Sequence, residues 1–474
     1  MHILSKSTYI KGLQCEKALY MTKKHPYLRD KLSIEQRAIF QRGTDVGILA
    51  QQVFPGGINM TPNYPTQFPQ KVKETMANLS NPEVKVMYEA VFQYNETLIM
   101  VDILVRKGDQ WKAIEVKSSL RLSQTYYNDA ALQYYVLHGC GVALSDFQLM
   151  HLNGDYVKDG PIDVHQLFKL VSVMDYAQEQ EPVIAANVER LKNVVAQPHS
   201  PLVNIGVHCH EPYTCDFLGH CWKHVPANSF LYTTALPDEI LFRYYFGGCG
   251  TNQLLMRQLD PNSEEAHQIE ALETNSYYID FKSLFAMAPN PRPRSVAYLN
   301  LLLDYPAVPE IDGTRPYQEM ILAFALTGDL EPDGHSTWNC FDDHSRWQEC
   351  IPLLEEKLAH YDLVACFTPM NLSATLIRHD ILPSQSLGHK IFNLFEVLAN
   401  AHLFHPILKK GYNLQHTAEA LFHDVKLFEH SRILVEAAAG ELTSYEQATN
   451  DLLIENEVIK RIYQHFFNST PVHN

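Results

Sequence analysis

The stretch Thr97–Ser119, TLIMVDILVRKGDQWKAIEVKSS, decides the fold predicted for the first part of this chain. Leu98–Val105 and Trp111–Val116 are rich in β-branched and aromatic residues, a composition typical of strands. Gly108-Asp109 between them is an acceptable two-residue hairpin turn. The stretch therefore predicts a β-hairpin. In its register the residue numbers of any two facing residues add up to the same value.

In this register Asp102 lies opposite Glu115, and Lys117 follows on the same face of the sheet. Two facing carboxylates with Cβ atoms about 5 Å apart repel each other, unless a divalent cation lies between them. Hard oxygen ligands suit Mg²⁺ or Mn²⁺, and a neighbouring lysine can bind a phosphate or position the attacking water. The alternative is an exposed hairpin whose charged residues form a solvated face. The flanking residues argue against it because they are apolar and predict burial on both faces: Met100, Val101, Ile103, Ile114 and Val116.

Length and composition describe an ordinary globular protein. The 474 residues are enough for two or three domains, and 46% of them are hydrophobic. No apolar run is long enough to span a bilayer, and the start MHILSKSTYIKG lacks a signal segment, so we expect a cytoplasmic protein without a membrane partner. Nine cysteines without a secretory signal argue against a disulfide framework and favour metal binding or core packing.

The net charge of -16 does not by itself indicate a nucleic-acid-binding protein. Up to Arg42, however, nine basic residues stand against three acidic ones, which gives a candidate phosphate-facing strip. The alternative is the solvated side of two helices. The candidate nucleic-acid contacts are Lys6, Lys11, Arg42 and Tyr135.

The hydrophobic pattern predicts further elements before and after the hairpin. Ser80–Gln93 leads into the first strand and contains Glu89, and the first predicted helix contains Cys15. The other predicted elements are helices at Ser5–Tyr20, Ile34–Val53 and Tyr126–Leu137, a strand at Phe147–Asn153, and a mostly helical stretch at Val164–Val195.

The segment from His208 to Trp222 contains Cys209, Cys215 and Cys221, separated by equal gaps in a stretch rich in turn formers. A neighbouring histidine would complete a zinc site. A fourth thiolate from Cys15 would instead favour tetrahedral zinc or an iron-sulfur cluster. Chance clustering of buried cysteines is the remaining alternative, and spacing alone does not decide among these.

The residues of the first half resemble a known group of nucleases. The segments LSKSTYIKGLQCEKALY, RGTDVGILAQQVFPGG, VDIL, IEVKSS, DAALQYYVL and HEPYTCDFLGHCW are similar to the RecB-like PD-(D/E)XK nucleases with an iron-sulfur staple. That group includes the AddB nuclease domain and the CRISPR adaptation nucleases. The sequences of these segments are more similar still to those of a bacterial family that joins such a domain to an RNase H-like, DEDD-exonuclease-like domain. The resemblance covers about the first 225 residues.

This resemblance implies an α/β chain with a restriction-endonuclease-like core, and it implies the roles of several residues. A metal-binding histidine of the family is replaced here by Gly47, so Glu89 is the substitute ligand that we expect. The implied catalytic residues are Asp102, Glu115, Lys117 and Gln133. The expected Mg²⁺ or Mn²⁺ ligands are Glu89, Asp102, Glu115 and Val116. The implied ligands of a 4Fe-4S cluster, with zinc as the alternative, are Cys15, Cys209, Cys215 and Cys221.

Three regions are predicted: a nuclease domain at 1–226, a helical connector at 227–275 and an RNase H-like domain at 276–474. In the last domain the family's first-strand carboxylates appear as Asp280-Phe281-Lys282, which predicts a degenerate, inactive site with a salt bridge between Asp280 and Lys282 on one strand face. The later acidic positions of the family appear at 367–372 and at Asn393-Leu394. The predicted strands of this domain are Tyr277–Phe281, Val296–Leu303, Met320–Leu326 and Leu363–Phe367, followed by mostly helical residues.

Two functions from different classes follow as hypotheses. The first is a metal-dependent DNA nuclease that acts on single-stranded or duplex ends in DNA repair or in defence against phage and mobile elements, with RNA as a further substrate. The second is a non-catalytic, nucleic-acid-binding scaffold subunit of a repair or defence complex. In either case the C-terminal domain is a candidate site for a protein partner.

Overall fold

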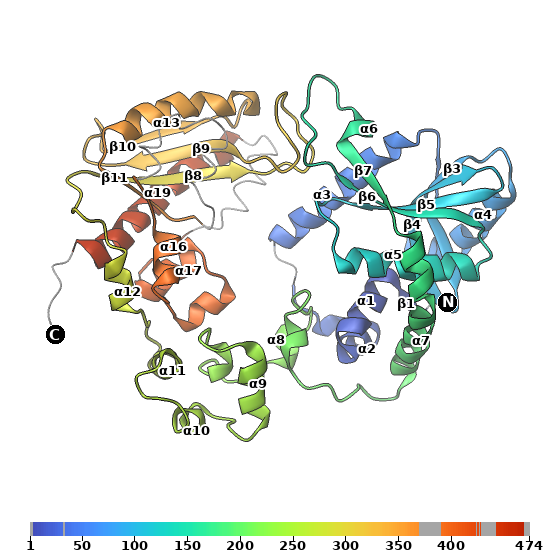
Figure 1. Ribbon diagram of the computed structural model, residues 1–474, viewed down its shortest axis with the longest axis horizontal. Helices are drawn as coiled ribbons and strands as arrows, with labels where there is room; N and C mark the ends of the chain where they lie inside the picture. The colour runs from blue at the N-terminus through green and yellow to red at the C-terminus, as the bar shows by residue number, and fades with distance from the viewer. Residues whose placement is uncertain are drawn as a thin grey trace. The chain divides into compact units, whose positions relative to one another are not determined.

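The computed structural model describes residues 3–31, 34–368, 390–422, 424–425, 427 and 442–468. The chain forms two compact units (Figure 1). The first unit consists of residues 1–224 together with 306–318, and the second consists of 225–305 and 319–474. The predicted connector at 227–275 therefore groups with the second unit, and a short later segment groups with the first.

The first unit is built on a seven-stranded mixed sheet. Six strands follow the order β2-β3-β4-β5-β6-β7, and the seventh, β1, pairs with β4. Its strands are β1 (Leu4–Ser5), β2 (Ile58–Asn59), β3 (Val86–Tyr94), β4 (Thr97–Lys107), β5 (Gln110–Lys117), β6 (Leu144–Leu152) and β7 (Phe168–Ser172). Its helices are α1 (Lys6–Gln14), α2 (Glu16–Lys24), α3 (Ile34–Ala50), α4 (Phe68–Ser80), α5 (Gln124–Gly139), α6 (Val164–Leu167), α7 (Met174–Ala196) and α8 (Leu218–Cys221). Short 3-10 helices lie at Pro26–Leu28, Gln51–Val53, Pro65–Gln67 and Val207–Cys209.

The predicted hairpin is confirmed. β4 and β5 pair antiparallel from Ile103 opposite Ile114 to Lys107 opposite Gln110, which is the expected register. Gly108 occupies the turn with a φ of 62°, a conformation that glycine adopts without steric cost. The paired ladder ends one step before the two carboxylates that the sequence placed opposite each other.

Two hydrophobic cores lie on the two faces of this sheet. One is built with side chains of α1, α2, α5 and α7, which lie together beside the sheet in Figure 1. The other includes Val46 and Ala50 of α3, and Ala307, Val308 and Tyr317 of the returning segment 306–318 also pack there. The first unit is therefore an α/β structure with its sheet in the middle, and residues far along the chain complete one of its cores.

Two predicted elements of this unit are wrong in detail. The first predicted helix is broken at Cys15, whose backbone is extended with φ -157° and ψ 115°, so α1 ends before it and α2 begins after it. The stretch Val164–Val195 is mostly helical as predicted, but between α6 and α7 it contains the unpredicted strand β7, which pairs antiparallel with β6. Tertiary pairing at the sheet edge outweighed local helix preference there.

The second unit is built on a five-stranded mixed sheet with the order β10-β9-β8-β11-β12. β8, β9 and β10 pair antiparallel, whereas β11 is parallel to both β8 and β12. The strands are β8 (Val296–Asp304), β9 (Met320–Thr327), β10 (His335–Asn339), β11 (Leu363–Cys366) and β12 (Ile391–Asn393). The helices are α9 (Asp238–Phe246), α10 (Asn252–Met256), α11 (Glu264–Thr274), α12 (Phe281–Ala286), α13 (Cys350–Ala359), α16 (Leu394–Asn400), α17 (Leu414–Leu421) and α19 (Leu442–Phe467). Short 3-10 helices lie at Phe230–Tyr232, His344–Glu349 and Pro406–Lys410.

Three predicted strands of the second unit are confirmed as β8, β9 and β11, but the strand predicted at Tyr277–Phe281 is wrong. Only an isolated bridge forms there, between Tyr278 and Phe404. The first strand of the sheet is instead β8, and its buried polar residue is Asn300. Of the later positions that the resemblance singled out, 369–372 lie outside the described residues, and Asn393 caps α16.

Asp280 has a local structural role that differs from the predicted one. Its carboxylate accepts hydrogen bonds from the backbone N–H of Lys282, at 3.0 Å, and from the hydroxyl of Ser283. Because the first amide groups of a helix have no partner within the helix, an aspartate at this position is stabilised as the N-cap of α12. The predicted ion pair with Lys282 is absent from the described part of the chain, since the carboxylate is engaged by the helix start.

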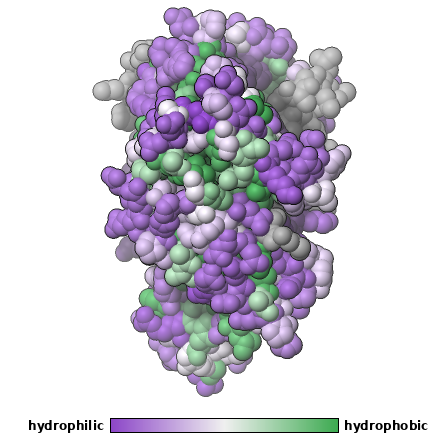
Figure 2. Space-filling model, turned by 90° about the vertical axis from the view of Figure 1, so that its right-hand side faces the viewer, coloured by the Kyte–Doolittle hydropathy of each residue, from purple (hydrophilic) through white to green (hydrophobic). Residues whose placement is uncertain are grey.

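None of the helices in the described residues combines the length and the apolar character that a bilayer crossing requires. On the face shown in Figure 2, hydrophilic residues predominate and hydrophobic residues lie between them. A surface of this kind is ordinary for folded proteins, because apolar atoms always supply part of the exposed area.

We predict that Asp280→Ala destabilises the second unit by about 1 kcal/mol, because the start of α12 loses its cap. Asp280→Asn should retain most of the stability, since asparagine caps a helix equally well. Urea denaturation of the full chain measures the difference between these variants. Equal losses in both would contradict the capping role.

Candidate active site

The backbone opens a gap in the sheet where the candidate carboxylates lie. β3 covers one edge of β4 along nearly its whole length. The other edge is shared by two strands, because β1 pairs with Thr97 and Leu98 while β5 pairs from Ile103 onward. Between Leu98 and Ile103 this edge of β4 is paired with neither β1 nor β5, and Asp102 lies in that interval. Lys6 follows β1 directly, so strand pairing brings it to the same opening.

β3 and β4 change faces together at this opening. Val101 and Leu104 both belong to the core that contains α5, although residues three apart in a regular strand point to opposite faces. The register is the same on both sides of the change, and Glu89 and Asp102 are the two residues between the paired positions Tyr88–Ile103 and Ala90–Val101. Glu89 has a φ of 52°, which is strained for a residue other than glycine. Strain of this kind is concentrated at functional sites.

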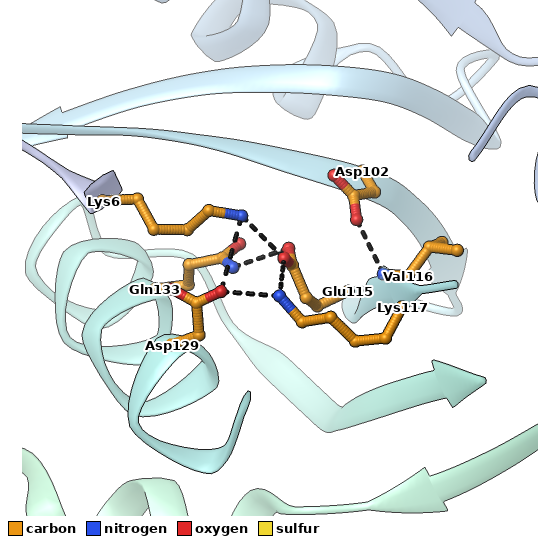
Figure 3. A network of polar contacts seen from close by, with 7 residues as sticks. All are labelled: Lys6, Asp102, Glu115, Val116, Lys117, Asp129 and Gln133. Carbon is orange, nitrogen blue, oxygen red and sulfur yellow. Dashed lines mark hydrogen bonds and ion pairs between the residues drawn. The ribbon is translucent and has the colours of Figure 1, made fainter. Parts of the chain in front are cut away.

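Glu115 is the centre of a polar network (Figure 3). Its side chain is 2% exposed, and its Oε1 accepts hydrogen bonds from Lys6 Nζ at 2.6 Å and Lys117 Nζ at 2.7 Å. Its Oε2 accepts one from Gln133 Nε2 at 2.7 Å. Lys117 Nζ also donates to Asp129 Oδ2 at 2.6 Å, and Lys6 Nζ lies 3.7 Å from the same oxygen. Residues from three elements, α1, β5 and two successive turns of α5, thus meet at one buried carboxylate.

Asp102 stands apart from this network in Figure 3. Its Oδ2 accepts the backbone N–H of Val116 at 2.6 Å. Of the sequence-predicted site residues, Glu115 therefore contacts both Lys117 and Gln133 directly, and Asp102 is held beside them through the strand that carries Glu115 and Lys117. Glu89 lies opposite Asp102 in the register of β3 and β4.

The acidic groups perturb one another. Burial, followed by the charge of Glu115, raises the pKa of Glu89 to about 7, although Lys6 opposes the shift. Burial and the same neighbour raise the pKa of Asp102 well above its usual range. Burial also disfavours the charge of Glu115, but Lys117 and Lys6 outweigh it and hold the pKa of that carboxyl below its usual range. Such opposed shifts among neighbouring carboxyls are characteristic of functional sites.

The charges at this site fit a divalent cation. Four carboxylates and two ammonium groups meet here, so two negative charges are left when all six are ionised. The carboxylates are those of Glu89, Asp102, Glu115 and Asp129, and the ammonium groups are those of Lys6 and Lys117. Hard oxygen donors are what Mg²⁺ and Mn²⁺ prefer.

No group of three or more histidine, cysteine, aspartate or glutamate side chains in the described residues is arranged to hold a metal ion. At the carboxylate site the cause is visible. Both oxygens of Glu115 are turned to Lys6, Lys117 and Gln133, and an oxygen of Asp102 is turned to a backbone amide. The ammonium groups supply the positive charge that the buried carboxylate needs.

The other candidate nucleic-acid contacts lie elsewhere. Lys11 is ion-paired with Asp216. Arg42 is partly exposed on α3, and among the described residues it forms no ion pair. Tyr135 is 6% exposed and its hydroxyl accepts a hydrogen bond from Asn95 at 2.9 Å, so it is a core residue. Of the four, Lys6 is the one that the structure joins to the catalytic candidates.

The four candidate cluster ligands lie together. A cavity of about 20 Å³ is lined by Cys15, at the break between α1 and α2, and by Cys209, Cys215 and Cys221. Burial raises the pKa of Cys215 to about 11 and also raises the pKa of Cys15 and of Cys221. The thiols of Cys15, Cys215 and Cys221 are therefore neutral at neutral pH unless a metal or cluster binds and displaces their protons.

Polar contacts fasten the cysteine loop to the N-terminal helices. The side-chain amide of Gln14 donates to the carbonyl of His208 at 2.8 Å and to that of Tyr213 at 2.6 Å. Asp216 pairs with Lys11 and, at 3.3 Å, with Arg29. The start and the end of the first 224 residues are thus connected at this point.

Two residues beside the site were not among the sequence-predicted site residues. Asp129 holds Lys117 and precedes Gln133 by one helical turn, and this i, i+4 spacing on α5 was the available signal. Tyr317, in the returning segment, donates its hydroxyl proton to the carbonyl of Ser118, directly after Lys117. Nothing local in the sequence indicates that second contact.

No family model matches the chain, and no curated protein matches it. The function proposed below therefore rests on the geometry and charge of the site.

We predict that Glu89→Gln changes the pH dependence of stability in the presence of a chelator. An unfolded glutamate titrates near 4.5, whereas Glu89 titrates near 7 in the folded chain, so the folded chain holds this proton more tightly. The contribution of the protonated Glu89 carboxyl to the free energy of unfolding is fully present below about pH 4.5, and it is lost as the pH rises through about 7. The difference in Tm, variant minus wild type, should therefore increase by several degrees as the pH is raised from 4.5 to 8. Thermal unfolding with parallel pH profiles for both proteins would contradict this.

Proposed function

We propose that this chain is a Mg²⁺- or Mn²⁺-dependent nuclease that hydrolyses DNA phosphodiester bonds, with a PD-(D/E)XK-type site of the RecB-like kind. The carrying observation is one partly buried cluster in which Glu115 binds Lys117 and the helix-borne Gln133 while Asp102 lies beside them. A solvated hairpin face would not need such partners, because exposed carboxylates are satisfied by water. Action in the cytoplasm on DNA ends, in repair or defence, is part of the proposal.

The residues that would hold the cation are Glu89, Asp102, Glu115 and the backbone carbonyl of Val116. When bound, the cation supplies Lewis acidity and makes water a stronger acid, so that hydroxide is accessible near neutral pH. Lys117 binds the attacked phosphate and stabilises the negative charge that develops on its oxygens.

Other residues of the cluster position these groups. Gln133 fixes the orientation of Glu115 through its 2.7 Å hydrogen bond, and Asp129 fixes the ammonium of Lys117 at 2.6 Å. Burial makes these electrostatic contacts stronger than they would be in water. The network therefore holds the reacting groups in place before substrate arrives.

An iron-sulfur cluster bound by the four cysteines of the small cavity is the second part of the proposal. Four thiols from two distant segments are a donor set suited to 4Fe-4S, and tetrahedral zinc is the alternative. The cluster would fasten the two ends of the nuclease region and act on its stability rather than on the chemistry.

The second unit is proposed to be a degenerate RNase H-like domain that binds substrate or a protein partner. Its five-stranded mixed sheet with helices is consistent with this. The polar residue in the middle of its first sheet strand is Asn300, whose amide donates to Glu455 at 2.7 Å. An amide at this position supplies no negative charge for a pair of metal ions, which supports a non-catalytic role.

We predict that Asp102→Asn, Glu115→Gln and Lys117→Met each reduce DNA cleavage at least about a hundredfold. The two carboxyl variants would lose a ligand of the cation, and the lysine variant would lose the charge that stabilises the phosphate oxygens in the transition state. The measurement is degradation of end-labelled single- and double-stranded DNA with Mn²⁺, with RNA in parallel. Matched controls on the same hairpin are Lys107→Met and Asp109→Asn, which are exposed and should cleave as the wild type does. Wild-type cleavage by the Asp102, Glu115 double variant would overturn the proposed function.

We predict that protein purified without oxygen contains iron and sulfide, and that Cys209→Ser or Cys215→Ser removes both and lowers the Tm. The thiolates are lost as ligands, and with them the connection between the two ends of the unit. Cys140→Ser is the matched control, because Cys140 lies in the same unit outside the cavity. One zinc per chain without iron would favour the zinc alternative, and the absence of both metals would rule out a cluster.

A further inference from the structure

Lys6 brings a second ammonium group to the site, and the proposed chemistry does not use it. Its Nζ donates to Glu115 Oε1 at 2.6 Å, the same oxygen that Lys117 reaches at 2.7 Å. One buried carboxylate oxygen thus has two cations. A divalent cation bound by Glu115 would be a third at the same place.

The position of Lys6 is set by the backbone. Strand β1 ends one residue before it and pairs in parallel with the start of β4. Helix α1 begins at Lys6, and the Ser5 N–H is fixed by Thr8 Oγ1 at 2.8 Å. The Lys6 Cα is therefore held on both sides, and what can move is the four-carbon side chain.

Of the two lysines, Lys6 is the less firmly held. Its side chain is 31% exposed, compared with 13% for Lys117. Lys117 binds Glu115 and Asp129 at 2.7 and 2.6 Å, whereas Lys6 approaches Asp129 only to 3.7 Å. The Lys6 side chain is therefore partly open to solvent, but its ammonium group is itself buried beside Glu115, so a ligand that arrives from solvent meets it only when the side chain moves.

We propose that Lys6 couples cation binding to nucleic-acid binding. Its ammonium group is ion-paired with Glu115 while no divalent cation is bound. When nucleic acid binds, the side chain moves and the ammonium forms an ion pair with a backbone phosphate instead. This inference rests on the proposed nuclease function. A cation that approaches Glu115 is repelled by Lys6 until a phosphate draws that ammonium away. A phosphate is a suitable acceptor, because lysine binds phosphate as a mobile point charge.

The coupling is reciprocal. If nucleic acid increases the affinity for the cation by some factor, the cation must increase the affinity for nucleic acid by the same factor. The nuclease would then load its catalytic cation chiefly when substrate is present. Removal of the Lys6 charge should make cation binding tighter in the absence of nucleic acid and should weaken the coupling.

The test measures Mn²⁺ affinity of the full chain by calorimetry, with and without a phosphorothioate oligodeoxynucleotide that resists hydrolysis. For Lys6→Met without the oligonucleotide, we expect Mn²⁺ to bind roughly tenfold more tightly than to the wild type, a typical coupling magnitude. The oligonucleotide should tighten Mn²⁺ binding more in the wild type than in the variant. Lys6→Gln keeps a hydrogen-bond donor for Glu115 without the charge and must behave as Lys6→Met does.

Lys71→Met is the matched control, because Lys71 lies on α4 and pairs at 2.9 Å with Glu74 of the same helix. It should bind Mn²⁺ as the wild type does. If the wild type binds Mn²⁺ and cleaves DNA but both Lys6 variants bind Mn²⁺ no more tightly than it does, the coupling is overturned and the nuclease function stands. A wild type that neither binds Mn²⁺ nor cleaves DNA overturns the nuclease function itself.

Discussion

The buried carboxylate of Glu115 is the constraint on which the site depends. An ionised carboxylate removed from water costs many kcal/mol unless cations and hydrogen-bond donors surround it. Two lysines and one glutamine meet that requirement, and they come from the chain start, from β5 itself and from α5. The packing of α1 and α5 against the same sheet face is therefore linked to the charge of one residue.

Much of the first unit could be predicted because its signals are local. The hairpin has strand-forming runs and a glycine turn, and α5 has a largely apolar run that ends at Gly139-Cys140-Gly141, so both were found with nearly the observed bounds. The joint change of face at Glu89 and Asp102 could not be predicted, since alternation assumes a regular strand. The contact between Lys6 and Glu115 joins residues 109 positions apart and has no local signal.

The second unit shows how one residue type serves two purposes. Aspartate followed two residues later by a lysine fits a strand face as well as a helix start, and sequence alone does not separate them. At Asp280 the unpaired amide groups of α12 decided the outcome. At Cys15 the same kind of ambiguity concealed a break between two helices, because residues on both sides favour helix. Helix ends are set by capping contacts that periodicity does not contain.

The returning segment 306–318 has a consequence for the order in which the protein is made. The first unit lacks part of one core, and the Tyr317 contact beside Lys117, until that segment has left the ribosome. Synthesis of residues 225–318 takes roughly 5 to 20 s at usual elongation rates. The nascent first unit therefore has an apolar face uncovered while the first strand of the second sheet, β8, is already being made. Completion of the first unit is in this way tied to translation of residues far beyond position 224.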